Sequence, residues 1–363
     1  MRALLARRPG VHFVGIGGPK MEALGLEVLY PMEKLAVRGL VEVVRHYFEI
    51  VGIRRRLRQR FLREKPALFI GIDSPDFNLD LELALKQAGI PTVQYVGPTI
   101  WAWRRERIYK VKKAVSLVLA LYPFEPPLYE QARVPVCYVG HPLADVLEHL
   151  PATDDVREEL RVATGVPVVA LLPGSRASEL EAMGEVFVRT AQLVQAEVPQ
   201  ARFLVPFASL ESKALFEAAL ARVQPEGLSI TLMIGHSLEA MAASDVVLVS
   251  SGTASLEAAL LKRPMVITYR LNRLTWWLVK NRFYVKHAGM PNILAGEEIV
   301  PELLQDDATP QKLAAAVLAL LADPTARARL DEHFERIRTA LRQDNADRVA
   351  SAIMPLLSRA RSA

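Results

Sequence analysis

The stretch Val168-Val-Ala-Leu-Leu-Pro-Gly-Ser-Arg176 decides the fold that we predict for this chain. Its first five residues form an apolar run rich in Val and Leu, which is typical of a strand buried on both faces. Pro173 and Gly174 end the run, and a helical pattern begins at Ser178. A strand that enters a helix through a short turn is the repeating unit of a parallel α/β sheet.

The same alternation of short β-branched runs with longer helical stretches extends in both directions from this unit. The first series of predicted strands is His12–Ile16, Leu68–Ile72, Thr92–Val96, Ser116–Leu121 and Cys137–Val139. The second series is Val168–Leu172, Arg202–Pro206, Ser229–Met233, Asp245–Val249 and Met265–Tyr269. A strandless stretch at about 146–165 separates the two series, so we predict two Rossmann-like sheets joined near residue 150.

Helical periodicity replaces the strands after Tyr269. Apolar residues recur at three- and four-residue spacing in Gln311–Leu321, Thr325–Arg342 and Asn345–Ser358. We therefore expect an N-terminal domain over residues 1–150, a C-terminal domain over 151–340, and a final helix over 341–363 that packs back across both.

Composition sets limits on the class of protein. Of the 363 residues, 51% are hydrophobic and 23% are charged, which is typical of a packed globular protein and excludes a disordered chain. The one cysteine, Cys137, excludes an internal disulfide and a cysteine metal cluster. A single cysteine fits a reducing compartment, so we expect an intracellular protein. No apolar run reaches the roughly 18 residues of a spanning helix, so we expect no transmembrane segment.

Charge is distributed unevenly along the chain. Residues 1–145 contain 22 Lys and Arg against 14 Asp and Glu, whereas the remainder contains 23 against 26. A basic first domain indicates an anionic partner, which is a phosphorylated metabolite, an anionic membrane surface or nucleic acid.

Two turns in the second half are candidate phosphate sites. Gly174 and Ser175 let backbone N–H groups approach a phosphate at a helix N-terminus, and Arg176 adds a forked cation. The second turn consists of Ser251, Gly252, Thr253 and Ala254. It offers similar donors, and Glu257 follows it at a position suited to the hydroxyls of a ribose. The alternative is that both turns are ordinary helix caps, with Ser178 and Glu181 as a capping box in the first.

Polar and aromatic residues also follow the strands of the first half. Asp73 comes directly after Leu68–Ile72 and is our first choice as a general base. The alternative is that Asp76 and Asn78 cap a helix that starts near Leu79, which we expect of at least one of them. The next strand leads into a loop that could line an apolar, anionic ligand site, with ordinary core aromatics as the alternative. The residues of that loop are Trp101, Trp103 and Arg104.

His141 ends the last strand of the first half, within the stretch GHPLAD (140–145). It is a candidate general base or phosphate ligand, and a hydrogen-bonded structural histidine is the alternative. The sequence contains no HExxH, Walker or zinc-ligand pattern, and Gly15-Ile-Gly17-Gly18 lacks the glycine spacing of a dinucleotide site. We therefore expect no metal and no cofactor.

The segment Leu40–Phe61 combines broad apolar character with five arginines between Arg54 and Arg60. Such a segment can lie in a membrane interface with its arginines on lipid phosphates. The alternative is a buried helix followed by a solvated basic one. Leu274–Tyr284, which contains Trp276 and Trp277, is a second candidate of this kind.

Taken together, these motifs resemble one family, lipid-A-disaccharide synthase of glycosyltransferase family 19. The matching stretches run in order along nearly the whole chain: FVGIGGPKM (13–21), EKLAVRGLVEV (33–43), GIDSPDFN (71–78), YVGPTIWAWRRERI (95–108), ALYPFE (120–125), YVGHPLAD (138–145), LLPGSRASELE (171–181), SSGTASLEAALLKRPMVITYR (250–270) and MPNILAGEEIVPELLQ (290–305).

The resemblance implies a GT-B fold of two Rossmann-like domains and an inverting transfer. UDP-2,3-diacylglucosamine and 2,3-diacylglucosamine 1-phosphate (lipid X) would give the β-1,6-linked disaccharide 1-phosphate and UDP. Asp73 would be the base, and Arg176 with the Gly252–Ala254 turn would stabilise the departing UDP. Glu257 would hold the ribose, and Asn292 would contact the nucleotide sugar. Glu179 and Asp145 would contribute to substrate binding.

The resemblance also implies where the protein acts and with what. We expect a cytoplasmic protein on the cytoplasmic face of the inner membrane, bound there through Leu40–Phe61. A homodimer is considered beside the monomer, and no nucleic acid partner is expected, because aromatic residues do not alternate with the basic run Arg54–Arg60.

One part of the family pattern is absent from the printed sequence. The family opens with a strand and a Gly-Glu-x-Ser-Gly-Asp loop, whereas Met1 here falls within what would be the first helix. We therefore expect an incomplete N-terminal sheet. The alternative functions are another GT-B enzyme, such as a UDP-N-acetylglucosamine 2-epimerase or a soluble-acceptor glycosyltransferase, and a non-catalytic membrane-surface or nucleic-acid binding protein.

Overall fold

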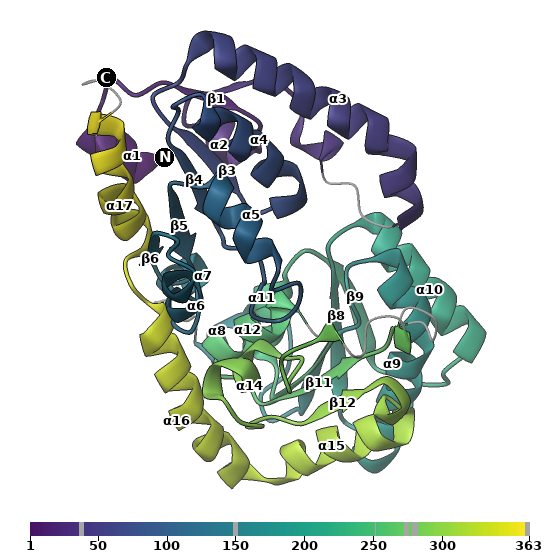
Figure 1. Cartoon of the computed structure of the whole chain (residues 1–363). Coiled ribbons are helices and arrows are strands. Elements are labelled where there is room, and N and C mark those ends of the chain that lie inside the picture. Colours follow the sequence, from purple (N-terminus) through teal and green to yellow (C-terminus); the bar gives the residue numbers. More distant parts are fainter. Residues whose placement is uncertain (36–39, 148–151, 251, 272–275, 278–281, 360–363) are drawn as a thin grey trace. The chain divides into compact units, whose positions relative to one another are not determined.

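The computed structural model describes residues 1–35, 40–147, 152–250, 252–271, 276–277 and 282–359, without the side chains of 40–46, 326 and 359. The contacts divide the chain into two compact units (Figure 1). Unit 1 comprises Met1–Asp145 with Leu341–Ala363, and unit 2 comprises Val146–Ala340.

Unit 1 alternates strands with helices. Its strands are β1 (Phe13–Gly15), β2 (Leu26–Val28), β3 (Phe69–Ile72), β4 (Thr92–Tyr95), β5 (Leu117–Ala120) and β6 (Val136–Tyr138). Its helices are α1 (Arg2–Arg7), α2 (Pro19–Glu22), η1 (Met32–Lys34), α3 (Leu40–Glu64), α4 (Pro75–Gln87), α5 (Arg107–Ala114), α6 (Pro126–Gln131), α7 (Pro142–Val146, which extends one residue past the unit) and α17 (Asn345–Arg359).

The strands of unit 1 form two parallel sheets. One has the order β3-β4-β5-β6, and the other consists of β1 and β2. Each strand predicted in this half is present, with its ends shifted by no more than one residue. The short strand β2 has no counterpart in the prediction because its three residues are too few to show a period.

Two apolar clusters hold unit 1 together. In one, α3 and α4 pack their inner faces against each other through Ile53, Leu57 and Leu81. In the other, Ile353 and Leu357 of α17 pack against Leu4 of α1 and against the sheet β3–β6. Figure 1 shows α1 and α17 side by side, so the two ends of the chain complete one core.

Unit 2 is built around a longer sheet. Its strands are β7 (Val168–Leu172), β8 (Arg202–Phe207), β9 (Ile230–Ile234), β10 (Val246–Ser250), β11 (Met265–Tyr269) and β12 (Glu302–Leu304). Its described helices are α8 (Thr153–Glu159), α9 (Ala177–Glu197), α10 (Leu210–Val223), α11 (Ser237–Ala243), α12 (Thr253–Leu260), α14 (Met290–Ala295), η3 (Gln305–Asp307), α15 (Pro310–Ala322) and α16 (Pro324–Leu341, whose last residue belongs to unit 1).

All six strands of this sheet are parallel, in the order β12-β11-β10-β7-β8-β9. This is the order of a doubly wound Rossmann sheet, whose direction of winding reverses between β7 and β10. The prediction that strands stop after Tyr269 was wrong, because β12 pairs with β11 at the edge. Only pairing with β11 identifies so short a segment as a strand.

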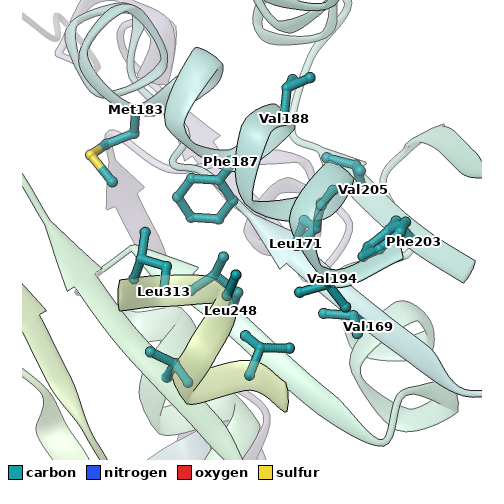
Figure 2. Close-up of a cluster of buried hydrophobic side chains, with 14 of the residues drawn as sticks. Val169, Leu171, Met183, Phe187, Val188, Val194, Phe203, Val205, Leu248 and Leu313 are labelled. Atoms are coloured by element: carbon teal, nitrogen blue, oxygen red, sulfur yellow. The ribbon is translucent and has the colours of Figure 1, made fainter. Parts of the chain in front are cut away.

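The core of unit 2 lies between the sheet and the helices α9 and α15. Figure 2 shows Phe187 of α9 and Leu313 of α15 directed toward Leu171 and Leu248 of the sheet. Every residue of β7 and β10 is buried, as expected for central parallel strands that helices cover on both faces.

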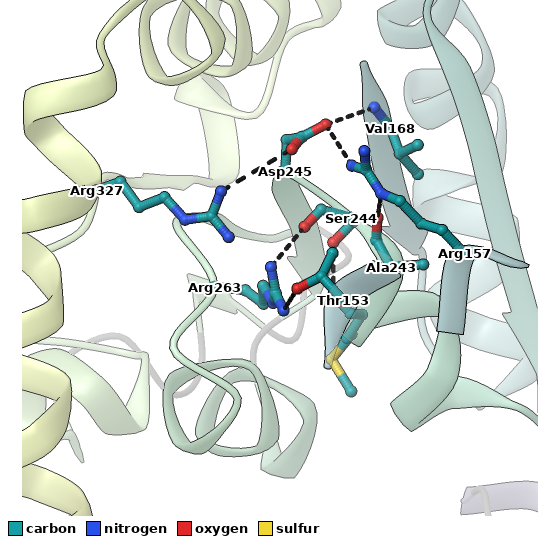
Figure 3. A network of polar contacts seen from close by, with 9 residues as sticks. Thr153, Arg157, Val168, Ala243, Ser244, Asp245, Arg263 and Arg327 are labelled. Carbon is teal, nitrogen blue, oxygen red and sulfur yellow. Dashed lines mark hydrogen bonds and ion pairs between the residues drawn. The ribbon is translucent and has the colours of Figure 1, made fainter. Parts of the chain in front are cut away.

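A polar network fixes the amino-terminal ends of β7 and β10 (Figure 3). Asp245 Oδ2 accepts hydrogen bonds of 2.9 Å from both Val168 N and Arg157 Nη2. The buried Arg263 donates to Thr153 Oγ1 at 2.6 Å, and burial lowers its pKa to about 10, so the guanidinium stays charged at neutral pH. This network lies at the opposite end of the strands from the loops that follow them.

Candidate active site

The two candidate phosphate loops of unit 2 lie next to each other at the winding reversal. Val249 pairs with Leu172 across β10 and β7, so the loops that follow leave the same edge of the sheet side by side. The Ser250 hydroxyl donates a hydrogen bond of 2.9 Å to the main-chain carbonyl of Pro173. Open α/β sheets bind ligands at this position, outside the carboxyl ends of the strands.

In the first loop, a carboxylate occupies the helix N-terminus. Glu179 Oε2 accepts from Ser175 N at 3.0 Å and from Arg176 N at 3.3 Å, and Glu179 Oε1 lies 2.9 Å from Arg176 Nη1. Gly174, at φ +124°, has a Glu179 atom 2.6 Å from where a Cβ would be. The alternative of a Ser178 and Glu181 capping box was wrong: α9 begins at Ala177, and its capping box is formed by Arg176 and Glu179.

The atoms around this carboxylate are those that would bind a phosphate. Backbone N–H groups at a helix start and a guanidinium attract any anion, and Glu179 satisfies them here. The Arg176 side chain is 58% exposed, so its guanidinium is also accessible from solvent. It lies within hydrogen-bond reach of Tyr269 at the end of β11, a residue that sequence reasoning missed.

The second loop leads into α12. Gly252 has φ +149°, a backbone conformation that favours glycine, and Ser255 Oγ bonds its carbonyl at 2.8 Å. Thr253 and Ala254 begin the helix, with Thr253 exposed. Ser251 lies outside the described residues.

Glu257 is half-buried on α12, and burial raises its pKa. Within the described part of the chain, the Glu257 carboxylate makes no hydrogen bond that would offset this shift. A partly desolvated carboxylate near two phosphate-type loops is chemically suited to accept hydroxyl donors.

Asn292 has a different environment. Its side chain is fully buried on α14, its amide donates to Val300 O and Glu302 Oε1, and its Oδ1 accepts from Ile299 N and Val300 N. These bonds fix the turn between α14 and β12. A contact between Asn292 and a nucleotide sugar stays a prediction.

In unit 1, Asp73 stands at the carboxyl end of β3 with an exposed side chain. Asp73 and Ser74 have φ values of +49° and +44°, which are uncommon for residues other than glycine. Three hydrogen bonds hold the Asp73 main chain: its N–H donates to Tyr95 O at 2.9 Å, and its carbonyl accepts from Asn78 Nδ2 at 2.8 Å and Gln94 Nε2 at 3.0 Å. These bonds thus fix the main chain that carries an exposed carboxylate.

The predicted roles of Asp76 and Asn78 as helix caps were wrong. Helix α4 begins at Pro75, four residues before Leu79, because proline suits the first helical position. Asp76 is exposed and pairs with Arg107 of α5, whereas Asn78 donates its side-chain N–H to the carbonyl groups of Ile72 and Asp73.

The loop after β4 carries the predicted tryptophans. The Trp103 indole donates to Thr99 Oγ1 at 3.0 Å, and the Arg104 guanidinium lies 4.2 Å from the Trp103 ring centroid. Trp101 makes edge contacts with Tyr122 and Phe124, which follow β5. Both tryptophans keep partly exposed surface at this edge of the sheet.

The loop after β5 lies in the family stretch ALYPFE (120–125), but sequence reasoning assigned it no role in the site. Glu125 is buried and accepts bonds of 2.9 Å from Leu121 N and Tyr122 N, and burial raises its pKa to about 7. Tyr122 stacks on Phe124. A pair of aromatics and a carboxylate directly after a buried strand was the signal that could have identified this loop.

His141 follows β6 and is 7% exposed. Its ring contacts Tyr122, and its Nδ1 accepts from Leu143 N at 3.3 Å. Burial lowers the pKa of His141 to about 4, so the ring is neutral at pH 7. Asp145 caps the start of α17 through Gln343 N at 3.2 Å and Asn345 N at 2.6 Å. The loops after β3, β4, β5 and β6 thus gather at one edge of the unit 1 sheet.

Helix α3 presents a basic and apolar outer face. Tyr47 and Phe48 are 53% and 83% exposed. A groove of about 540 Å³ between α3 and α4 is lined by Val51 and Leu62 together with Arg54, Arg55 and Arg58. The side chains of Leu40–His46 and much of Leu274–Tyr284 lie outside what the structure describes. Among the described helices, none is both long and apolar enough to span a bilayer.

The described residues contain no group of three or more His, Cys, Asp or Glu side chains placed to hold a metal ion. The groups at the two sheet edges are backbone N–H and guanidinium groups that bind anions, together with carboxylates and aromatic rings. Such a set can bind phosphorylated and glycosidic ligands and can accept a proton from a hydroxyl.

Comparison with known proteins gives a consistent result. The family model described as lipid-A-disaccharide synthetase matches residues 1–354. The lipid-A-disaccharide synthase of Methylobacillus flagellatus is 51% identical, covering 98% of this chain and 94% of its own length. That of Chromobacterium violaceum is 52% identical, covering 98% and 92%.

Solved structures agree on the fold at low identity. Anabaena HepE, in complex with UDP and glucose, is 16% identical with a TM-score of 0.58, covering 98% of this chain and 94% of its own. The UDP-GlcNAc 2-epimerase of Neisseria meningitidis, bound to UDP-GlcNAc, is 13% identical with a TM-score of 0.58, covering 95% and 100%. The predicted GT-B fold of two Rossmann-like bodies is confirmed, and at these identities the likeness concerns the fold alone.

Proposed function

This chain belongs to the lipid-A-disaccharide synthetase family, and on that premise we propose that Asp73 activates the acceptor while Arg176 stabilises the leaving UDP. The chain is a glycosyltransferase that forms the lipid A disaccharide from a UDP-sugar and lipid X. Its specific substrates are UDP-2,3-diacylglucosamine and 2,3-diacylglucosamine 1-phosphate.

The reaction makes one bond and breaks one. The acceptor 6-hydroxyl oxygen attacks the anomeric carbon, the bond from that carbon to the diphosphate oxygen breaks, and UDP leaves with the bonding electrons. The hydroxyl proton passes to the Asp73 carboxylate. The exposure of this carboxylate, on a main chain held by three hydrogen bonds, is the observation that carries the assignment.

The departing diphosphate needs positive charge close to its oxygens. Arg176 and the N–H groups at the starts of α9 and α12 supply it, and the Ser250 bond to Pro173 keeps the two loops together. Before UDP binds, Glu179 satisfies the first loop, so the diphosphate replaces a carboxylate among the same donors. Glu257 accepts the ribose hydroxyls, and Asn292 orders the turn beside the nucleotide sugar.

The lipid acceptor is bound by the loops at the carboxyl edge of the unit 1 sheet. Trp101 and Trp103 provide apolar surface, Arg104 provides charge for the 1-phosphate, and the neutral His141 and Asp145 support the loop after β6.

The test of the base compares Asp73→Asn with Asp76→Asn, the neighbouring exposed carboxylate of the same segment. At saturating substrates, Asp73→Asn lowers kcat by roughly 100-fold or more, whereas Asp76→Asn stays within a few-fold of the unmodified protein. Thermal unfolding establishes that both variants are folded. A folded Asp73→Asn protein with full turnover removes Asp73 from the role.

We further propose that the outer face of α3 binds the anionic surface of the inner membrane. Exposed Tyr47 and Phe48 would enter the interface while Arg55 and Arg58 contact lipid phosphates. The Arg55→Glu/Arg58→Glu variant should lose cosedimentation with anionic phosphatidylglycerol vesicles. The matched control is Lys113→Glu/Arg133→Glu, an equal change of charge at two exposed positions outside α3. If both variants lose cosedimentation equally, the binding depends on the net charge of the protein and not on α3.

A further inference from the structure

Three buried polar side chains lie beneath Asp73, and the roles proposed above use none of them as reacting groups. Asn78 and Glu82 project from α4, and Gln94 projects from β4. Glu82 and Gln94 have no measurable exposed surface. Buried polar groups are normally hydrogen-bonded, so each one that is not requires a reason.

Gln94 bonds two strand ends at once. Its Nε2 donates to the Asp73 carbonyl and to the Val96 carbonyl, each at 3.0 Å. These carbonyls belong to residues with φ values of +49° and +71°. A positive φ is unfavourable for an L-residue and most unfavourable for a β-branched one such as Val96. One amide group therefore stabilises the strained conformations at the ends of β3 and β4 together.

Glu82 occupies the space beside Gln94. Its Oε1 is 2.3 Å from where a Cβ on Gly71 would be, so this carboxyl group takes the place of a side chain on β3. Gly71 pairs with Gln94 in the register of β3 and β4. Neighbouring strands are about 4.8 Å apart, which places the carboxyl group within reach of the Gln94 amide. Within the described residues, neither Glu82 oxygen nor Gln94 Oε1 has a hydrogen-bond partner.

We propose that Glu82 and Gln94 are positioning residues for Asp73: the neutral Glu82 carboxylic acid donates its proton to Gln94 Oε1, which turns the Gln94 NH₂ group toward the Asp73 and Val96 carbonyls. This one hydrogen bond gives Gln94 Oε1 a donor and the Glu82 hydroxyl an acceptor, so it leaves only the second Glu82 oxygen of the three without a partner. The inference rests on the proposed role of Asp73 as the base.

The protonation state of Glu82 agrees with this arrangement. Burial raises the pKa of Glu82 to about 8, so the acid is neutral at pH 7 and has an O–H to donate. A buried acid without a function would be a liability, because leucine would fill the same space without an unsatisfied polar group. Activity and stability should therefore respond to Glu82→Leu in opposite directions.

The test measures kcat, the KM of each substrate and the midpoint of thermal unfolding in four variants. Glu82→Leu removes the donor, and Glu82→Gln keeps a neutral donor of the same shape. Gln94→Met removes the amide group. Thr92→Val is the control, because Thr92 is also buried on β4. Its hydroxyl donates a hydrogen bond of 2.7 Å to the Ala114 carbonyl and makes no bond to Asp73.

We expect Glu82→Leu to keep or raise the unfolding midpoint and to lower kcat by roughly 10- to 100-fold, since a displaced catalytic group costs rate. Both KM values should stay within about threefold, because the change affects the base and not binding. Glu82→Gln should restore kcat to within about threefold. Thr92→Val should lower the midpoint and leave kcat unchanged.

Coupling to Asp73 distinguishes positioning from a general loss of structure. In an Asp73→Ala protein, Glu82→Leu should cause no further loss of the residual rate, since residues that act as one unit are not additive. A Glu82→Leu protein with full kcat, beside an inactive Asp73→Asn protein, overturns the positioning role alone. An active Asp73→Asn protein overturns the base role and this inference with it. If Gln94→Met does not fold, the proposal is still tested by Glu82→Leu, by Glu82→Gln and by the double variant of Glu82→Leu with Asp73→Ala.

Discussion

The Ser250 hydroxyl donates a hydrogen bond of 2.9 Å to the carbonyl of Pro173, and this contact joins the two loops that we assign to UDP. The two residues are far apart in the sequence, but the pairing of β10 with β7 brings them together. Because β7 and β10 are parallel, the helices that follow them begin at the same edge of the sheet. The two loops thus form one candidate diphosphate site rather than two separate ones.

Replacing Ser250 with alanine should loosen this connection. The buried Pro173 carbonyl loses its partner, which costs about 1–3 kcal/mol of unfolding free energy, and the KM for the UDP-sugar should rise several-fold. Ser244→Ala is the control, because Ser244 Oγ makes a similar buried bond at the opposite end of the strand. It should lower stability without changing the KM, and a KM increase in both variants would contradict the prediction.

Arg176→Ala should lower kcat by roughly 100- to 1000-fold, because the leaving diphosphate loses its cation. Arg176→Lys should recover part of this loss, since lysine restores charge but not the forked geometry. Steady-state kinetics and unfolding midpoints measure both effects. Arg202→Ala, which removes an exposed arginine at the start of β8, should leave kcat unchanged.

Glu257→Ala should weaken competitive inhibition by UDP by roughly tenfold, because two hydroxyl contacts are lost. The informative ligand is 2′-deoxy-UDP. The unmodified protein should bind it more weakly than UDP, and the Glu257→Ala protein should bind both alike, since a site built for a hydroxyl penalises its absence. Continued discrimination in the variant would assign the ribose to another residue.

The stability of unit 1 should depend on pH through Glu82. Its pKa is raised to about 8 in the folded protein from an ordinary value of 4.5, so the folded state holds an extra proton between these values. Its contribution to stability is therefore full below about pH 4.5 and is lost as pH rises through 8, at no more than about 1.4 kcal/mol per pH unit.

Two other buried groups influence the same measurement. The raised pKa of Glu125 makes stability fall as pH rises, as for Glu82. The lowered pKa of His141 instead makes stability rise with pH between about 4 and 6.5. Denaturant unfolding from pH 5 to 8 is therefore compared between the unmodified protein and Glu82→Gln, which retain both groups. The stability of the unmodified protein relative to Glu82→Gln should fall as pH rises, and parallel curves would show that folding does not raise the pKa of Glu82.

Several features followed from local sequence because local physics dictates them. The apolar runs of β7 and β11 predict the first and last residue of both strands correctly, since a central parallel strand is buried on both faces. The turn after β7 and the carboxylate after β3 indicated phosphate and base chemistry through residue type and position. The motifs together indicated the family, which the full-length match confirmed.

Other features depend on contacts between distant residues. Strand β12 is too short to show a period and exists only beside β11. The start of α4 follows from Pro75, and the anion position of α9 is filled by Glu179 instead of by the predicted capping box. Burial of Asn292 and capping of α17 by Asp145 likewise depend on partners that sequence spacing does not reveal.

By itself, the sequence determined most of the strands, the family and the loops that are candidates for the site, because propensity, apolar period and motif spacing are properties of neighbouring residues. Tertiary structure alone decided that Ser250 meets Pro173 and that Gln94 bonds both Asp73 and Val96. It also decided that Glu82 is buried against Gly71. Pairing in a sheet and desolvation in a core arise only when segments distant in the chain come together.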